Sequence, residues 1–178
     1  MAAAQTALAA YTKLCTGNNG GGNKLYFMLP ENLTSMTLGT GVQSYDTITL
    51  PTGKFFYEFL FEEYTIGLTP VLEGAKGAQK WTNTLMFDLG GLSDTERTGI
   101  MSLIDNSACG LIGVFVDNND VQWVLGYDEK DAKLHPLNVT SGAGDSKKDL
   151  LEASEMIVTM VSVSREHPRV TTATIVTS

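Results

Sequence analysis

The sequence predicts a mainly β domain with one buttressing helix, built as an antiparallel β-sandwich or small barrel with a short N-terminal helix added. Three observations predict this class. Apolar and polar residues alternate along several segments, glycine-rich turns separate these segments, and residues 93–107 carry helical spacing. A chain of 178 residues is long enough for one domain with a sizeable core.

Residues 1–23 are expected to form a unit apart from this domain. Ala2–Leu14 contains good helix formers and ends at Cys15, and the glycine- and asparagine-rich stretch 18–23 then breaks the helix. The segment has neither the charged start nor the strong apolar run of a signal peptide. No apolar run in the chain reaches the length of a membrane span, so we expect no membrane insertion.

The main domain is expected to cover residues 24–168, and β patterns fill its first half. The expected strands are 25–29, 43–50, 54–64, 65–72 and 80–89, and 73–80 is a glycine loop. Segment 54–64 is the most aromatic of them. Alternation places four of its aromatic residues on one face, where most should enter the core: Phe55, Tyr57, Phe59 and Phe61.

The helix of the domain is predicted at 93–107. Ser93 and Glu96 have the spacing of a capping box, in which each side chain bonds the backbone N–H of the other residue. Apolar and small residues then recur on one narrow face that suits packing on a sheet: Ile100, Leu103, Ile104 and Ser107.

The second half of the domain is predicted to return to strands. We expect strands at 109–116, 121–126 and 155–164, with a loop at 141–145. Residues 169–178 have high β propensity but no core signal of their own. They are therefore expected to form an extended C-terminal arm.

The acidic stretch between Phe115 and Gly126 raises two alternatives, a calcium loop or a hairpin tip. Counted from Asp117, an EF-hand loop needs an oxygen ligand at its fifth position and glycine at its sixth. Val121 and Gln122 stand there instead. Asn118 and Asn119 suit the left-handed backbone of a two-residue turn, which favours the hairpin.

Other chemistry-bearing residues lack the spacing of known sites. Cys15 and Cys109 lie far apart and are expected to be buried reduced thiols. His135 and His167 each precede a proline, which is typical of loop histidines. No hydrolase, zinc-protease or phosphate-loop motif occurs. We therefore expect no catalytic residue, no cofactor and no metal site.

The net charge of −8 argues against tight binding of nucleic acid. Twelve basic residues are scattered among twenty acidic ones, whereas proteins that wrap nucleic acid cluster Lys and Arg against the phosphates. Weak contact with nucleic acid, or repulsion of it, remains compatible with this charge.

Segment 111–169 resembles virion proteins of phages that infect Bacteroidetes, including crAss-like phages. Three motifs carry the resemblance: a hairpin of the form V-D-N-N-G-x-x-W-x-L-G, an S-G-x-G loop and a final E-x-x-P. Asp120 replaces the turn glycine of the first motif. The matching residues are Val116, Asp117, Asn118, Asn119, Trp123, Leu125 and Gly126, then Ser141, Gly142 and Gly144. Glu166 and Pro168 correspond to the third motif but stand one residue closer together than E-x-x-P requires.

This resemblance implies a tail-tube, tail-ring or head–tail connector protein, with a β-sandwich or small barrel flanked by a helix. Such a subunit forms a homo-oligomeric ring, contacts neighbouring tail or connector proteins, and surrounds a channel for genomic DNA without binding it specifically. In such a ring, the candidate arms that reach neighbouring subunits are the glycine loop 73–80 and the two termini, the C-terminal one by strand addition. Its location would be the virion, after synthesis in the host cytoplasm. An acidic protein suits such a channel, because like charge disfavours contact with DNA.

Two other functions stay open on the sequence alone. One is an accessory capsid or receptor-binding virion module. The other is a small β-fold ligand-binding protein or hydrolase that uses His135 or the acidic loop. For the ring hypothesis, the candidate interface residues are Phe56, Tyr64, Gly74, Lys76, Gly77 and Ile175.

Overall fold

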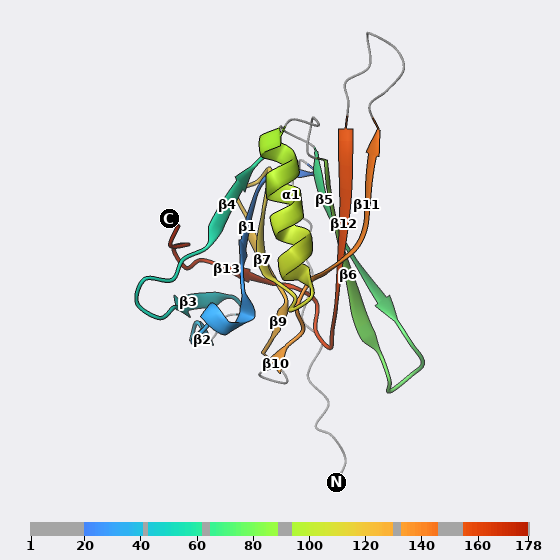
Figure 1. The fold of residues 1–178 in the computed structure, drawn as a ribbon. Helices are drawn as coiled ribbons and strands as arrows, with labels where there is room; N and C mark the ends of the chain where they lie inside the picture. Colours follow the sequence, from blue (N-terminus) through green and yellow to red (C-terminus); the bar gives the residue numbers. More distant parts are fainter. Residues whose placement is uncertain are drawn as a thin grey trace.

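Strands make up most of the protein in the computed structural model, which describes residues 20–40, 43–61, 65–88, 94–129, 133–145 and 155–177 (Figure 1). The expected N-terminal helix lies outside these residues. The strands are β1 (Gly22–Met28), β2 (Ser35–Leu38), β3 (Tyr45–Thr49), β4 (Tyr57–Leu60), β5 (Ile66–Glu73), β6 (Lys80–Asp88), β7 (Ile112–Asp117), β8 (Gln122–Leu125), β9 (Tyr127–Asp128), β10 (Lys133–Leu134), β11 (Asn138–Asp145), β12 (Glu155–Ser164) and β13 (Arg169–Thr171). The helices are the 3-10 turn η1 (Pro30–Asn32) and α1 (Asp94–Ser107).

The predicted fold class, mainly β with one α-helix, is confirmed. One large sheet has the hydrogen-bonded order β11-β12-β6-β5-β1-β7-β8-β13-β3-β2, and β4 pairs with β1. This order has two ends, so the sheet does not close into the barrel that was one of the two expected architectures. Strands β9 and β10 form a separate small hairpin.

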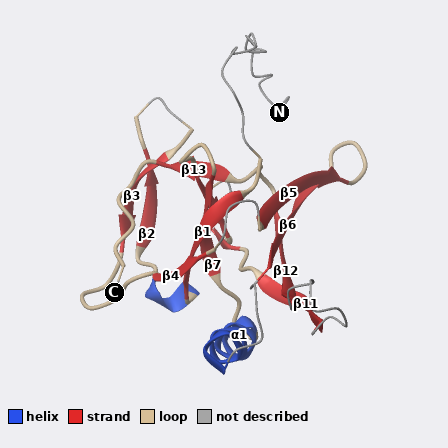
Figure 2. Cartoon of the chain, turned by 90° about the horizontal axis from the view of Figure 1, so that it is seen from above, coloured by secondary structure: helices blue, strands red, loops and turns tan. Residues whose placement is uncertain are grey.

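The large sheet changes direction between β5 and β1, where it is held by a single residue pair, Gly22 with Ile66. On one side of this junction, β5, β6, β12 and β11 form a four-stranded sheet. On the other side, β1, β7 and β8 form the central sheet of the molecule. Figure 2 shows the two parts lying at an angle to each other.

The central sheet is buried on both faces, and each face contributes to a different core. Leu25 and Phe27 of β1 enter a first core that also contains Leu85 of β6 and Leu103 of α1. Met28 enters a second core, together with residues of β2, β3 and the segment before β4. The second core consists of Met28, Met36, Tyr45, Phe56, Ile112, Val114 and Val124.

Helix α1 covers the first core, as its sequence predicts. Leu103 is buried against the sheet, and the Ser107 hydroxyl donates a hydrogen bond of 2.7 Å to the Ile104 carbonyl in the last turn. Ile104 is 39% exposed, so the apolar face is narrower than the sequence pattern indicates. Ser93 of the expected capping box lies outside the described residues.

The aromatic segment 54–64 is a shorter strand than its alternation predicts. Only Tyr57–Leu60 forms a strand, paired with β1. Phe59 and Phe61 pack against the first core as expected, but Tyr57 is 55% exposed. Phe56, of the opposite parity, is fully buried in the second core. The prediction was therefore wrong at residues 56 and 57, because the chain passes at this point from a bridge with Thr177 into the pairing of β4 with β1, so a single alternation does not run through the segment.

Two further predicted segments differ in the structure. Residues 141–145 are not a loop but part of β11, where pairing with the long strand β12 overrides their glycine content. Residues 169–177, predicted to be an arm for a neighbouring subunit, pack on their own chain. Strand β13 pairs with β8 and β3, and Thr177 bridges to Phe56.

Candidate functional site: a polar cluster and an open-edged sheet

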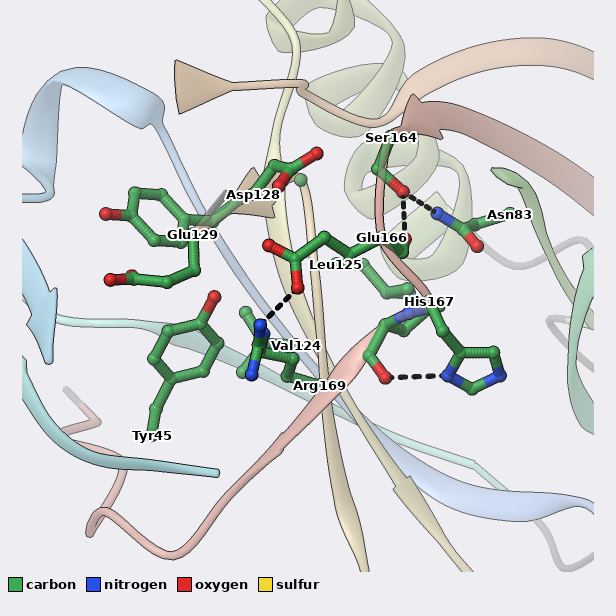
Figure 3. Close-up of a pocket in the computed structure, with 13 residues that line it drawn as sticks. Tyr45, Asn83, Val124, Leu125, Asp128, Glu129, Ser164, Glu166, His167 and Arg169 are labelled. Carbon is green, nitrogen blue, oxygen red and sulfur yellow. Dashed lines mark hydrogen bonds and ion pairs between the residues drawn. The ribbon is translucent and has the colours of Figure 1, made fainter. Parts of the chain in front are cut away.

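A polar cluster lies where the chain turns from β12 into β13 (Figure 3). The buried Asp128 carboxylate accepts a hydrogen bond of 2.7 Å from the Arg165 backbone N–H and lies 3.9 Å from His135 Nε2. Glu166 pairs with Arg169, whose guanidinium also donates to Gln43 Oε1. These contacts tie the β12–β13 turn to β9 and to the start of β3.

The remaining members of the cluster have no arrangement for nucleophilic catalysis. Burial, with a smaller contribution from nearby Glu129, raises the pKa of Tyr45 above its ordinary value, so the phenol stays protonated. His167 lies between Trp81 and Trp123, with ring centroids 4.8 and 5.7 Å away, and its Nδ1 is 2.9 Å from the Pro168 carbonyl oxygen. Both histidines therefore have structural contacts.

An open hollow of about 320 Å³ lies beside this cluster and is bordered by Glu166, His167 and Arg169. The cavity within the cluster has a volume of about 10 Å³, which is room for about one water molecule. Asn83 borders it and donates to Ser164 Oγ at 3.0 Å, which links β6 to the end of β12. In the part of the chain that the structure describes, no group of three His, Cys, Asp or Glu side chains converges on a common point. The cluster is best explained as a set of structural contacts that hold the β12–β13 turn in place.

The acidic loop is a hairpin tip between β7 and β8. Asp117 Oδ1 accepts hydrogen bonds from the backbone N–H groups of Asn119 (2.8 Å) and Val121 (2.9 Å), and Oδ2 accepts one from Trp123 Nε1 (3.2 Å). The left-handed residue is Asp120, with φ of 61°. The predicted two-residue turn at Asn118–Asn119 is therefore wrong: the loop has three residues, and Asp120 stands where glycine is usual.

Of the prediction that the cysteines are buried reduced thiols, the burial was wrong for Cys109 and the free thiol is confirmed. Cys109 is a free thiol and is exposed, because it lies in the turn after α1 rather than inside a strand. Cys15 lies outside the described residues.

The four-stranded sheet β5-β6-β12-β11 offers the more extensive functional surface, because both of its edges are open within the part of the chain that the structure describes. Beyond the single pair Gly22–Ile66, β5 has no strand partner among the described residues on the side away from β6. At the other end, β11 is the last strand of the order. Each edge strand is eight residues long.

Backbone groups on the β5 edge are directed outward at alternate residues. The Asp88 N–H donates to the Thr65 carbonyl, so Thr65 faces β6, and alternation turns Leu68, Pro70 and Leu72 away from it. Pro70 has no N–H, which leaves the edge with donors at Leu68 and Leu72 only. A hollow of about 300 Å³, bordered by Gly67, Leu68 and Pro70 along with residues of β7 and β8, lies beside this edge.

The outward face of this sheet carries apolar side chains that the sequence analysis did not single out. Val71, Met86 and Val163 are 44%, 49% and 40% exposed. They come from three neighbouring strands and share the face opposite the buried Leu85 and Met160. Strict alternation in β6 and β12 could have identified them, since every second residue of a sheet with one core face must point outward.

The structure separates the six predicted interface residues. The prediction of an interface position was wrong for Phe56. Its side chain is completely buried in its own chain and its backbone N–H is bonded to the Val176 carbonyl, so it belongs to the core. Ile175 is partly buried on the same core. Gly74, Lys76 and Gly77 lie together on the exposed tip of the β5–β6 hairpin. Tyr64 lies outside the described residues.

None of the helices among the described residues is long and apolar enough to cross a membrane. In the comparisons with known proteins, no family model, curated protein or solved structure matches the chain. Its function is therefore argued from its own surfaces.

Proposed function

We propose that this chain is a structural subunit that assembles with copies of itself into a ring, as a tail-tube, tail-ring or head–tail connector protein of a virion. The observation that carries the proposal is the four-stranded sheet with two open edges and an uncovered, partly apolar face. Long open edges invite pairing with another chain, and soluble proteins normally shorten, cover or charge them.

The two edges are different surfaces, so pairing between them is head-to-tail. Strand β11 of one copy would pair with β5 of the next, and each added copy exposes the same two edges again. A heterologous contact of this kind produces a closed ring when the rotation between copies is right. Pro70 limits how strongly β5 can pair, since it removes one donor from the edge.

The charge of the chain supports the same proposal. Ring subunits around a DNA channel must let a polyanion pass, and a net charge of −8 disfavours adhesion. The resemblance of segment 111–169 to phage virion proteins agrees with this role, and the polar cluster offers no competing chemistry. No cofactor is invoked.

Sedimentation velocity and negative-stain microscopy over a range of protein concentrations test the proposal. We expect a discrete ring-sized species. Thr69→Lys places a charge on the open strand β5, and should lower the assembled fraction at least tenfold. Thr37→Lys makes the same change on the exposed edge strand β2 and should leave assembly unchanged. A chain that sediments only as a monomer at every concentration contradicts the proposal.

A further inference from the structure

The β5–β6 hairpin ends in a well-defined tip beyond the rest of its sheet (Figure 1). The Ala78 N–H donates to the Ala75 carbonyl at 2.9 Å, and Thr82 Oγ1 donates to Glu73 at 2.8 Å just below the turn. Gly74 has φ of 110°, and a Cβ there would meet the Ala78 carbonyl oxygen at 2.3 Å. The turn therefore requires glycine at this position.

This tip carries apolar residues that its own chain does not bury. Val71 and Leu72 are 44% and 47% exposed, and alternation places them on opposite faces of the hairpin. Lys76 lies at the apex and is exposed. We call these three residues the hairpin tip. It combines an apolar pair with a positive charge in a chain that has twelve basic and twenty acidic residues.

An apolar groove lies between α1 and strands β1 and β4. Its volume is about 290 Å³, and it is lined by Phe27, Met28, Leu29, Tyr57, Phe59, Ser102, Leu103, Asn106 and Leu111. The Asn106 amide donates to the Ser102 carbonyl at 2.7 Å, so this polar group is occupied within the helix. What remains on the groove wall is mainly aromatic and aliphatic.

The size and lining of the groove suit protein side chains better than a small molecule. Ligand pockets usually have 300–1,000 Å³ and a few converging polar groups that orient the ligand. The groove is at the lower end of this range, and no charged side chain lines it to orient a ligand. Asp105 is exposed on α1. Because residues three apart are neighbours on a helix surface, we infer that its negative charge lies beside Ser102 of the groove wall.

We propose that the α1–β4 groove of one copy binds the hairpin tip of a second copy. Leu72 or Val71 would enter the groove, and Lys76 would lie near Asp105 at its rim. Complementary charge brings such surfaces together and fixes their register, while burial of the inserted apolar side chain holds them. This inference rests on the proposed self-assembly and adds a contact separate from the pairing of sheet edges.

Cys109 provides a native reporter of this contact. It is exposed in the turn after α1, and its N–H is bonded to the Asn106 carbonyl of the groove wall. In a Cys15→Ser chain, Ala75→Cys adds a thiol to the tip. Mild oxidation at assembling concentration should give cross-linked dimers and higher ladders on a non-reducing gel. Cys15→Ser alone, or with Thr37→Cys in place of the tip thiol, should give at least fivefold less.

Charge reversal supplies the second readout. In the cross-linking chain, Lys76→Glu and Asp105→Lys should each lower the yield about three- to tenfold, and the two together should restore it. If wild-type protein forms rings but the tip thiol cross-links no better than the Thr37→Cys control, the groove contact is wrong and the ring proposal stands. The same holds if the reversed pair gives no rescue. A chain that stays monomeric at every concentration overturns both.

Discussion

At the scale of single residues, the Asp117 side chain fixes the conformation of the loop between β7 and β8. Its carboxylate accepts three hydrogen bonds, two from the backbone of the loop and one from the Trp123 indole. The loop thereby holds Asp120 in a left-handed conformation, which costs a non-glycine residue some strain. An acidic stretch that resembles a ligand loop in sequence is, in the structure, an internally bonded turn.

Asp117→Ala should lower the free energy of unfolding by about 2–3 kcal/mol, because each lost hydrogen bond contributes about 1 kcal/mol. Urea unfolding followed by Trp fluorescence measures this. Asp120→Asn removes the same charge from an exposed position of the loop and should change stability by less than about 0.5 kcal/mol. Equal losses in the two variants would point to net charge rather than these bonds.

Tyr45 should make stability depend on pH in the alkaline range. Burial favours its neutral form and raises its pKa above the ordinary value of 10.0. The unfolded chain therefore loses this proton first, so the contribution is complete below about pH 10 and is lost as the pH rises further. Urea unfolding between about pH 8 and 11 should show a smaller decline for Tyr45→Phe than for wild type. Raised pKa values of Tyr26 and Tyr127 leave a residual slope.

At the scale of elements, segment 54–61 contains one aromatic residue that is buried in the core, Phe56, next to one that is exposed, Tyr57. Phe56→Ala should lower the free energy of unfolding of the monomer by about 3–5 kcal/mol, because it empties a buried site. Tyr57→Ala, at the exposed neighbouring aromatic, should cost less than about 1 kcal/mol. Denaturant unfolding at a concentration below assembly separates the two. A small loss at both positions would return Phe56 to the interface.

Elements were predictable from the sequence where local pattern and tertiary environment agree. The helix at 94–107 and strands such as 155–164 and 80–88 follow from periodicity alone. Segment 141–145 was missed because glycine signals a loop locally, whereas its pairing partner lies on another strand. The β5 and β11 edges, and the groove beside α1, depend on strand order, which periodicity does not encode.

At the scale of the whole molecule, the C-terminal segment closes the second core. Tyr45 accepts hydrogen bonds through its carbonyl from Thr171 Oγ1 and the Thr172 N–H, at 3.0 and 2.9 Å. Ile175 packs on the core, and the Val176 carbonyl accepts a hydrogen bond of 2.8 Å from the Phe56 N–H. Residues far apart in the sequence are thus joined around one sheet. Removing the segment should therefore lower the stability of the whole domain.

Deletion of residues 172–178 should therefore destabilise the isolated subunit rather than only its assembly. Loss of the Ile175 packing and of the hydrogen bonds made by Thr172 and Val176 should cost about 2–3 kcal/mol, which lowers Tm by roughly 5–10 °C in a domain of this size. Calorimetry of the monomer measures this shift. Ile175→Lys should reproduce most of the loss, and Thr174→Lys, at an exposed neighbour, should not. If the deletion leaves Tm unchanged but abolishes rings, the segment acts instead as an arm between subunits, because an arm contributes nothing to the chain from which it extends.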